Sequence, residues 1–397
     1  MADPAPVSPG PAGVTPARVP LYAGFLLTGV VTVLLGPLLP ELSREWRLPV
    51  DRLAPLFVAQ FLASALGSFL SSYRQGLSLV LGYLLIAVGL LSLAIATWPL
   101  ALGAVAATGL GLGLAIPATN LRVAHSQPTR RGAALSSLNL AWGAGAVACP
   151  LLFAARPRGT SSDAVLVVLA VAAGLVLLLL VRALGGAQYR ADPESAGDSN
   201  QASTPAGITV ALAIIAAILF LYVGIENAVG GWLVSLADQF QPARAATSLW
   251  IGSGFWAALL ASRALAPLLL RRFSEPALYS AGIALAGVGL VGLLSGRSLE
   301  VVAVSAVAVG AGLAPLFPLT ISFLAELTAS SRSRSTGWVF ALAGTGGAAM
   351  PWLTARLAGG ADRLATGFVA PMAGLVFLAL LFGLLRRLGG TTQPQPV

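Results

Sequence analysis

The residues of this sequence best suited to chemistry are a few polar side chains set inside apolar runs. The stretch LYVGIENAVGGWLV places Glu226 and Asn227 side by side in a segment that holds no other charge. Moving an ionised carboxylate into hydrocarbon costs about 2.5–3.5 kcal/mol on insertion scales, so Glu226 should face a protein interior, be paired, or hold a proton. Because burial disfavours a charged carboxylate, such a residue is suited to reversible proton uptake.

Arg263 is the basic residue best placed to pair with Glu226. It lies in a second apolar run, GFWAALLASR, which starts at Gly254. If the two runs are neighbouring antiparallel helices, a rise of about 1.5 Å per residue puts both charges at similar depths. Glu226 has three interpretations: a structural salt bridge with Arg263, a solvated position in a cavity, or a coupling site where it binds a proton or solute and Arg263 is its charge partner. Arg74, in a short polar stretch, is a second gating candidate.

Amide and indole side chains inside apolar runs form a second group of candidates. Carboxamides can donate and accept hydrogen bonds at once, which suits the hydroxyl groups of a sugar, and an indole face can stack on a sugar ring. The same side chains can instead join helices, since hydrogen bonds between helices are common in membranes. The candidates for solute binding in this group are Gln60, Asn120, Asn139, Asn227, Trp142 and Trp232.

Residue counts argue against other chemistries. A single cysteine, Cys149, rules out an intramolecular disulfide, and with one histidine, His125, a cysteine–histidine metal cluster cannot form. No serine, histidine and acidic residue share a plausible depth, so we expect no enzyme activity and no cofactor. The 23 basic residues are all arginines, scattered singly or in pairs, which argues against a nucleic-acid partner.

The elements that position these residues are predicted to be transmembrane helices. Hydrophobic residues make up 57% of the 397 residues and charged residues 9%, a composition typical of a membrane protein. Apolar segments of about 18–30 residues, long enough to cross about 30 Å of hydrocarbon, are separated by charges and prolines. The twelve predicted spans are Tyr22–Leu39, Leu53–Ser71, Leu77–Trp98, Leu100–Leu121, Ala133–Ala154, Ala164–Val181, Ile208–Ala237, Ser248–Leu270, Ala277–Leu294, Val301–Leu327, Thr336–Leu353 and Thr366–Leu385.

These spans fall into two halves of six that repeat each other. GLGLGLAIPAT at Gly109 aligns with GAGLAPLFPLT at Gly310, and the same shift along the chain carries Pro150 onto Pro351. The repeat predicts an all-α membrane protein with two pseudo-symmetric six-helix bundles and a solute site between them. The predicted parts are a disordered tail at 1–19, bundles at 20–183 and 207–388, a polar cytoplasmic linker at 184–206 and a tail at 389–397.

Arginine is also the main guide to orientation. The loops on the side of the two termini carry the larger share of the 23 basic residues, and cytoplasmic loops carry such an excess. We therefore expect a multi-pass protein of the lipid bilayer, in a bacterial inner membrane, with both termini cytoplasmic. We expect it to act as a monomer.

Over residues 20–388 the chain resembles the major facilitator superfamily. Within it, LYVGIENAVGGW, GFWAALLASR, PLFPLT and LNLAWGAGAVACP look like the branch of fucose, galactose and glucose:proton symporters and their sodium–glucose relatives. The resemblance implies ion-driven uptake of a monosaccharide, with a proton or sodium as coupling ion and Glu226 near the substrate. One departure is Ser71, which stands where the superfamily usually has an aspartate and leaves Arg74 alone in that loop.

The residues and the resemblance favour a secondary transporter that moves a small neutral solute, such as a monosaccharide, by alternating access. Glu226 would take the proton, and the amide and indole candidates would bind the solute. The alternative is a proton-driven efflux antiporter for drugs or lipophilic metabolites, which the motif GAGAVACP supports. An amide-rich pocket with a carboxylate favours the sugar, whereas an apolar pocket favours efflux. A non-transporting membrane receptor is a remote third alternative.

Overall fold

A computed structural model of the chain describes seven stretches, and these consist of helices and short connections without a β-strand. The predicted linker and nearly all of both predicted tails lie outside the described residues. The described stretches are 18–71, 74–126, 131–157, 159–183, 206–240, 245–328 and 336–390.

Each predicted span coincides with one helix or with two consecutive helices. The first span is divided into α1 and α2, and the tenth into α11 and α12. The helices are α1 (Arg18–Thr32), α2 (Leu35–Trp46), α3 (Pro55–Leu70), α4 (Gln75–Ile95), α5 (Ala101–Ser126), α6 (Arg131–Ala154), α7 (Ser162–Ala183), α8 (Ala206–Asp238), α9 (Ala245–Leu269), α10 (Glu275–Ser295), α11 (Leu299–Leu313), α12 (Leu316–Thr328), α13 (Thr336–Ala358), α14 (Leu364–Gly367) and α15 (Val369–Gly390), with 3-10 turns η1 (Val50–Leu53) and η4 (Ala361–Arg363).

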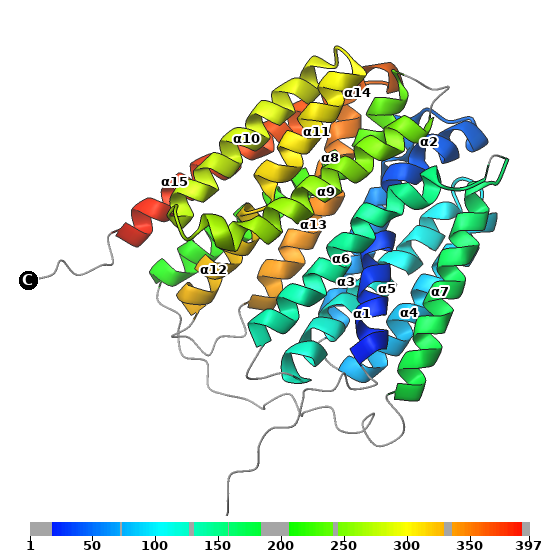
Figure 1. The fold of residues 1–397 in the computed structure, drawn as a ribbon, viewed down its shortest axis with the longest axis horizontal. Helices are drawn as coiled ribbons and strands as arrows, with labels where there is room; N and C mark the ends of the chain where they lie inside the picture. Colours follow the sequence, from blue (N-terminus) through cyan, green and yellow to red (C-terminus); the bar gives the residue numbers. More distant parts are fainter. Residues whose placement is uncertain are drawn as a thin grey trace, which may run out of the picture.

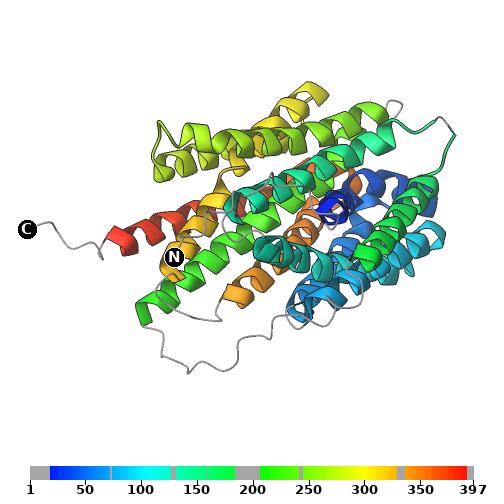
Figure 2. The same cartoon turned by 60° about the horizontal axis from the view of Figure 1, so that its bottom comes forward.

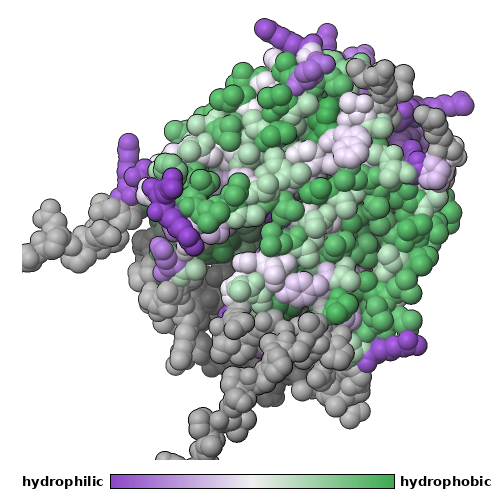
Figure 3. Space-filling model, in the orientation of Figure 1, coloured by the Kyte–Doolittle hydropathy of each residue, from purple (hydrophilic) through white to green (hydrophobic). Residues whose placement is uncertain are grey.

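The described helices have the length and composition of a multi-pass membrane protein. Ten segments are long and apolar enough to cross a bilayer, and the bent pair α1–α2 makes an eleventh. The helix α13 lies at the predicted eleventh span but is less apolar than these. Apolar residues cover the middle of the face drawn in Figure 3, and hydrophilic residues gather at its edges. The predicted all-α fold of twelve spans in two bundles is confirmed.

The sequence repeat reappears as a repeat of helix packing. In the first half a methyl group on Gly111 of α5 would lie 2.6 Å from the carbonyl oxygen of Gly82 on α4. In the second half a methyl group on Gly312 of α11 would lie 2.6 Å from the carbonyl oxygen of Gly282 on α10. Both helix pairs therefore approach so closely that a side chain larger than hydrogen does not fit.

The two bundles lie side by side, α1–α7 and α8–α15 (Figure 1), and in the view of Figure 2 helices of the two halves overlap along their boundary. Across the boundary α3 packs on α13, α6 on α9, and α2 on α8. The hydroxyl of Ser253 donates to the carbonyl of Val147 at 2.9 Å, and Gly347 faces the ring of Phe61. Helices α3 and α9 are the second spans of their halves, and α6 and α13 are the fifth spans. The contact of α3 with α13 and that of α6 with α9 are therefore equivalent, each joining a second span to a fifth span of the other half.

The break between α1 and α2 follows from a proline. Helices α1 and α2 meet at an angle of 46°. Pro37 has no N–H for the carbonyl of Val33, which instead accepts from the N–H of Gly36 at 3.1 Å. This shift frees the carbonyl of Thr32, and Nε2 of Gln60 on α3 donates to it at 2.9 Å. A side chain thus replaces the lost backbone bond, as a membrane interior requires.

The break between α11 and α12 also follows from a proline, and here too a side chain of a neighbouring helix donates to the freed carbonyl. Pro315 lies in the gap between the two helices and cannot donate to the carbonyl of Ala311. The hydroxyl of Ser262 on α9 donates to that carbonyl at 2.9 Å. Each half therefore contains one broken span whose freed carbonyl is held by a side chain of a neighbouring helix.

Candidate functional site

The most unusual electrostatic feature of the described chain is an ion pair inside the second bundle. Nη2 of Arg263 on α9 lies 3.3 Å from Oε2 of Glu226 on α8, with 25% and 9% of the two side chains exposed. The same Nη2 donates to the hydroxyl of Tyr222 at 2.6 Å. The structure therefore brings together the two charges whose depths matched in the sequence, and adds a tyrosine one helical turn from Glu226.

Aromatic rings enclose the guanidinium. Its carbon lies 5.8 Å from the ring centroid of Phe317 on α12, and the rings of Phe317 and Tyr222 are 5.5 Å apart. Nε of Arg263 is shielded from solvent and has no hydrogen-bond partner among the described residues. The arginine is thus held by one nitrogen and by ring faces, and part of its hydrogen-bonding capacity is unused.

A second ion pair near the ends of α2 and α6 provides a contrast. Nη1 and Nη2 of Arg156 each donate to one carboxylate oxygen of Glu41 at 2.6 Å. This bidentate geometry satisfies both ends of the guanidinium, unlike the single contact of Arg263 with Glu226. Sequence analysis did not single out this pair, because both residues lie at span ends, where charges are common.

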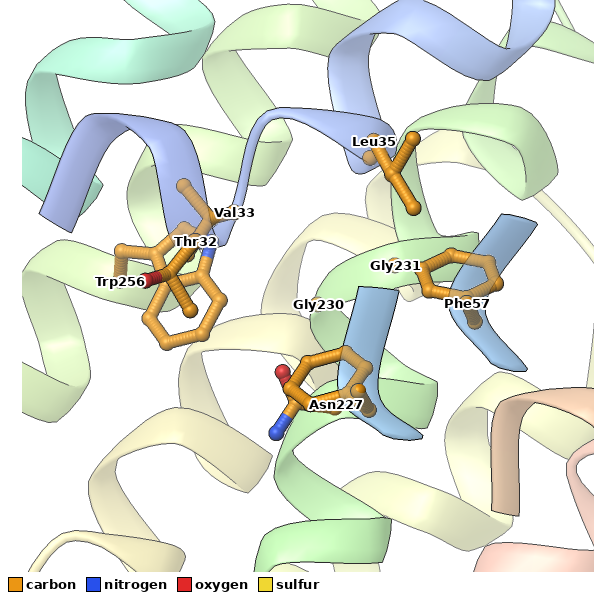
Figure 4. A pocket seen from close by; sticks show the side chains of 10 residues that line it. Thr32, Val33, Leu35, Phe57, Asn227, Gly230, Gly231 and Trp256 are labelled. Carbon is orange, nitrogen blue, oxygen red and sulfur yellow. The ribbon is translucent and has the colours of Figure 1, made fainter. Parts of the chain in front are cut away.

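A narrow pocket lies between the halves (Figure 4), and one of its lining residues, Asn227, directly follows Glu226 on α8. The break between α1 and α2 and the helix α3 line it from the first half, and α8 and α9 line it from the second. In Figure 4, Thr32 and Trp256 lie on one side and Phe57 on the other, with Asn227 at the lower edge. The lining residues are Thr32, Val33, Leu35, Gly36, Phe57, Phe61, Asn227, Gly230, Gly231 and Trp256.

Of the predicted amide candidates, the structure brings only Asn227 to this pocket. Its Nδ2 donates to the carbonyl of Val223 on its own helix at 2.8 Å, which leaves Oδ1 able to accept. Nδ2 of Asn120 and of Asn139 likewise donates to the carbonyl four residues earlier, and neither residue lines the pocket. Gln60 is 3% exposed and uses its amide nitrogen on Thr32.

The predicted tryptophans have different surroundings. Trp232 is fully buried, donates from Nε1 to the carbonyl of Pro351 at 2.9 Å and packs on Phe57, so its ring face is closed to a solute in this conformation. Trp142 on α6 meets Trp256 on α9 edge to face, with ring centroids 6.0 Å apart. Trp142 therefore supports a pocket residue across the boundary between the halves.

Arg74, the second gating candidate, is exposed at the start of α4 and makes no ion pair with a described residue. Sequence analysis missed Thr32, Phe57 and Phe61 as pocket residues and did not choose Trp256. Aromatic and small residues are common in apolar spans, so their types carry no signal. The available signal was Pro37, which fixes the helix break beside Thr32.

The ion pair has no counterpart in the first half. Leu26 and Leu27 on α1 occupy the places that Glu226 and Asn227 occupy on α8 when LYAG is aligned with LYVG. The architecture therefore does not require a charge at this position, and the carboxylate is a property of the second half alone.

Solved structures share this architecture. The peptide transporter POT in complex with sulfate is 18% identical over 96% of each chain, with a TM-score of 0.77. The chain has the major facilitator fold. A bacterial homolog of the human lysosomal transporter Spinster, in an inward-facing and occupied conformation, is 13% identical over 97% of this chain and 100% of its own, with a TM-score of 0.73. No family model and no curated protein sequence matches the chain.

The major facilitator fold is as far as these similarities reach, because identities below 20% speak for the fold alone. These two solved neighbours are a peptide transporter and a Spinster homolog, so they lend no support to the sugar-symporter branch. That branch stays a prediction from short motifs.

Proposed function

We propose that the protein is a secondary active transporter that works by alternating access and couples solute movement to a proton carried by Glu226. The observation that carries the proposal is a pocket lined from both halves, one of whose lining residues, Asn227, follows the ion-paired Glu226 on α8. A site shared by two pseudo-symmetric bundles can face either side of the membrane when they rock against each other. We further propose that both termini are cytoplasmic, as the arginine bias predicts.

The proton step in this proposal is the exchange of one partner for another at Glu226. Ionised Glu226 pairs with Arg263, whereas protonated Glu226 no longer holds the guanidinium electrostatically. Two titratable or charged side chains belong to the hydrogen-bonded group around Glu226: Arg263 on α9, which donates to it, and Tyr222 on α8, which accepts from the same nitrogen of Arg263. The arginine also contacts Phe317 at the start of α12. If the pair with Glu226 separates and Arg263 moves, its contact with α12 changes as well.

The pocket lining bears on the kind of solute. It offers one amide, on Asn227, and one hydroxyl, on Thr32, among aromatic, aliphatic and glycine residues. A monosaccharide needs several polar partners, and the other amide candidates do not line the pocket. This lining favours a solute with an apolar body, the class expected for the efflux alternative, over the predicted sugar.

Reconstitution in liposomes tests the proposal. We expect an imposed pH gradient to drive labelled solute through the wild type, with panels of monosaccharides and of small lipophilic compounds assayed in parallel. Glu226→Gln should abolish gradient-driven movement and retain exchange of solute between the two sides, because binding survives while the proton site is lost. Glu41→Gln, which removes the carboxylate of the other ion pair, is the matched control and should keep coupling.

Two results would count against this function. Unchanged gradient-driven transport by Glu226→Gln would remove the glutamate from the coupling step. Absence of transport and exchange for every compound in both panels would contradict the transporter itself and favour the receptor alternative.

A further inference from the structure

The guanidinium of Arg263 uses only part of its hydrogen-bonding capacity. Nη2 makes both of its hydrogen bonds to described residues, one to Tyr222 and one to Glu226. By contrast, both terminal nitrogens of Arg156 are engaged by the carboxylate of Glu41. The side chain of Arg263 is 25% exposed, and it retains donors that a second oxyanion could use, among them Nε, which makes no hydrogen bond to a described residue.

Helix geometry places these donors on the same face of α9 as a residue that lines the pocket. Trp256, which lines the pocket, and Arg263 are seven residues apart on α9, so they share a helix face and are separated by about 10 Å along the axis. Glu226 precedes the pocket residue Asn227 on α8. A solute whose apolar body contacts Trp256 and Phe57 can therefore direct one polar end toward Arg263.

We propose that Arg263 binds the carboxylate of an amphipathic monoanion, and that Glu226 is the internal carboxylate which this solute replaces. The proposal rests on the transporter function and names its substrate class. A planar guanidinium matches a carboxylate with two parallel hydrogen bonds, which the present single contact does not provide. One arginine balances one negative charge, and the aromatic side chains of the lining offer ring faces to the apolar remainder.

Binding of matched probes to the purified full chain tests this assignment. The probes are phenylacetate, cyclohexanecarboxylate and hexanoate, each compared with its uncharged amide, with tryptophan fluorescence and thermal unfolding as readouts. We expect the acids to bind the wild type more tightly than the amides. Glu226→Gln should tighten binding of the acids about tenfold by removing the internal competitor, and should leave the amides unaffected.

Two further variants complete the experiment. The double variant Glu226→Gln/Arg263→Gln carries no buried charge, so it avoids misfolding from an unpaired glutamate, and it should bind acid and amide equally. Arg156→Gln removes an arginine outside the pocket and should keep the wild-type preference for acids.

Three results would overturn the assignment: equal binding of acid and amide by the wild type, an acid preference that survives in the double variant, or no binding of any acid in the panel. Each of these leaves the transporter proposal intact if a pH gradient still drives another solute through the reconstituted protein, so the two proposals fail separately.

Discussion

At the scale of single residues, one nitrogen of Arg263 serves two acceptors on α8. Its distance to Glu226 is 3.3 Å, longer than the about 2.7–2.9 Å usual for a charge-assisted bond, whereas the bond to Tyr222 measures 2.6 Å. Loss of the arginine would leave a carboxylate with 9% exposure and no counter-charge. A buried ion without a partner is among the most costly defects in a protein interior.

We therefore expect Arg263→Gln to lower stability by on the order of 3 kcal/mol. Glu226→Gln/Arg263→Gln removes both charges and should recover most of that loss. Thermal unfolding in detergent compares the two variants. If the single variant is as stable as the double one, Glu226 does not depend on the arginine for compensation.

At the scale of helices, the two broken spans depend on side chains of their neighbours. Gln60 holds the carbonyl freed in the first span and Ser262 the carbonyl freed in the tenth. Both donors come from the second span of a half, α3 and α9. These helices therefore both lie at the boundary between the halves and hold the two breaks, of which the one between α1 and α2 lines the pocket.

Gln60→Leu should destabilise the protein by about 1–3 kcal/mol, because the carbonyl of Thr32 loses its donor in a buried setting. Gln60→Glu is the matched variant: its carboxyl group can donate only when protonated, so its stability should rise as the pH is lowered. Thermal unfolding across a pH series measures both effects. A Gln60→Leu protein that unfolds like the wild type would mean that the break needs no cap.

The close approach of α4 and α5 can be tested with two glycines of α5, one where an added methyl group contacts α4 and one where it contacts nothing. Gly111→Ala should cost about 1–3 kcal/mol, since the added methyl group meets the carbonyl oxygen of Gly82 at 2.6 Å. Gly103→Ala on the same helix meets nothing within 4 Å and should be neutral or slightly stabilising. Similar unfolding temperatures for the two variants would contradict the tight packing.

Helices were predictable from this sequence, but their bends and the pocket were not. Apolar length, together with the charges and prolines that separate the segments, predicted the spans, because hydrocarbon thickness fixes helix length. The break at Thr32 depends on Pro37 acting through a hydrogen bond four residues away, and its cap comes from another span. The pairing of Glu226 with Arg263 was predictable because charges are few, whereas Phe57 and Trp256 resemble every other aromatic residue in the chain.

At the scale of the whole molecule, alternating access requires the halves to rock about contacts that stay packed. The contacts of α3 with α13 and of α6 with α9 are related by pseudo-symmetry. Both contacts join the two halves, so we expect the halves to rock about them. Fixing one of them should hold the protein in the present conformation.

Ala65 and Gly344 provide the place to fix it. A Cβ on Gly344 of α13 would lie 3.7 Å from that of Ala65 on α3, within the about 3.5–4.5 Å that a disulfide requires. In a Cys149→Ser background, Ala65→Cys/Gly344→Cys should cross-link on oxidation and stop transport, and a reductant should restore it. A protease site placed between α7 and α8 lets gel mobility report the cross-link. Transport that continues in the fully cross-linked protein would contradict rocking.

The carboxylate of Glu226 in the middle of α8, unrepeated on α1, also determines how the membrane voltage acts. One carboxylate carries one proton per cycle, so a monoanion that moves in the same direction as the proton would cross with no net charge and the electrical potential would not drive it. A neutral solute moving with the same proton would gain about 2.3 kcal/mol for every 100 mV. Uptake measured in proteoliposomes held at different potentials therefore separates an acid from a sugar by voltage alone.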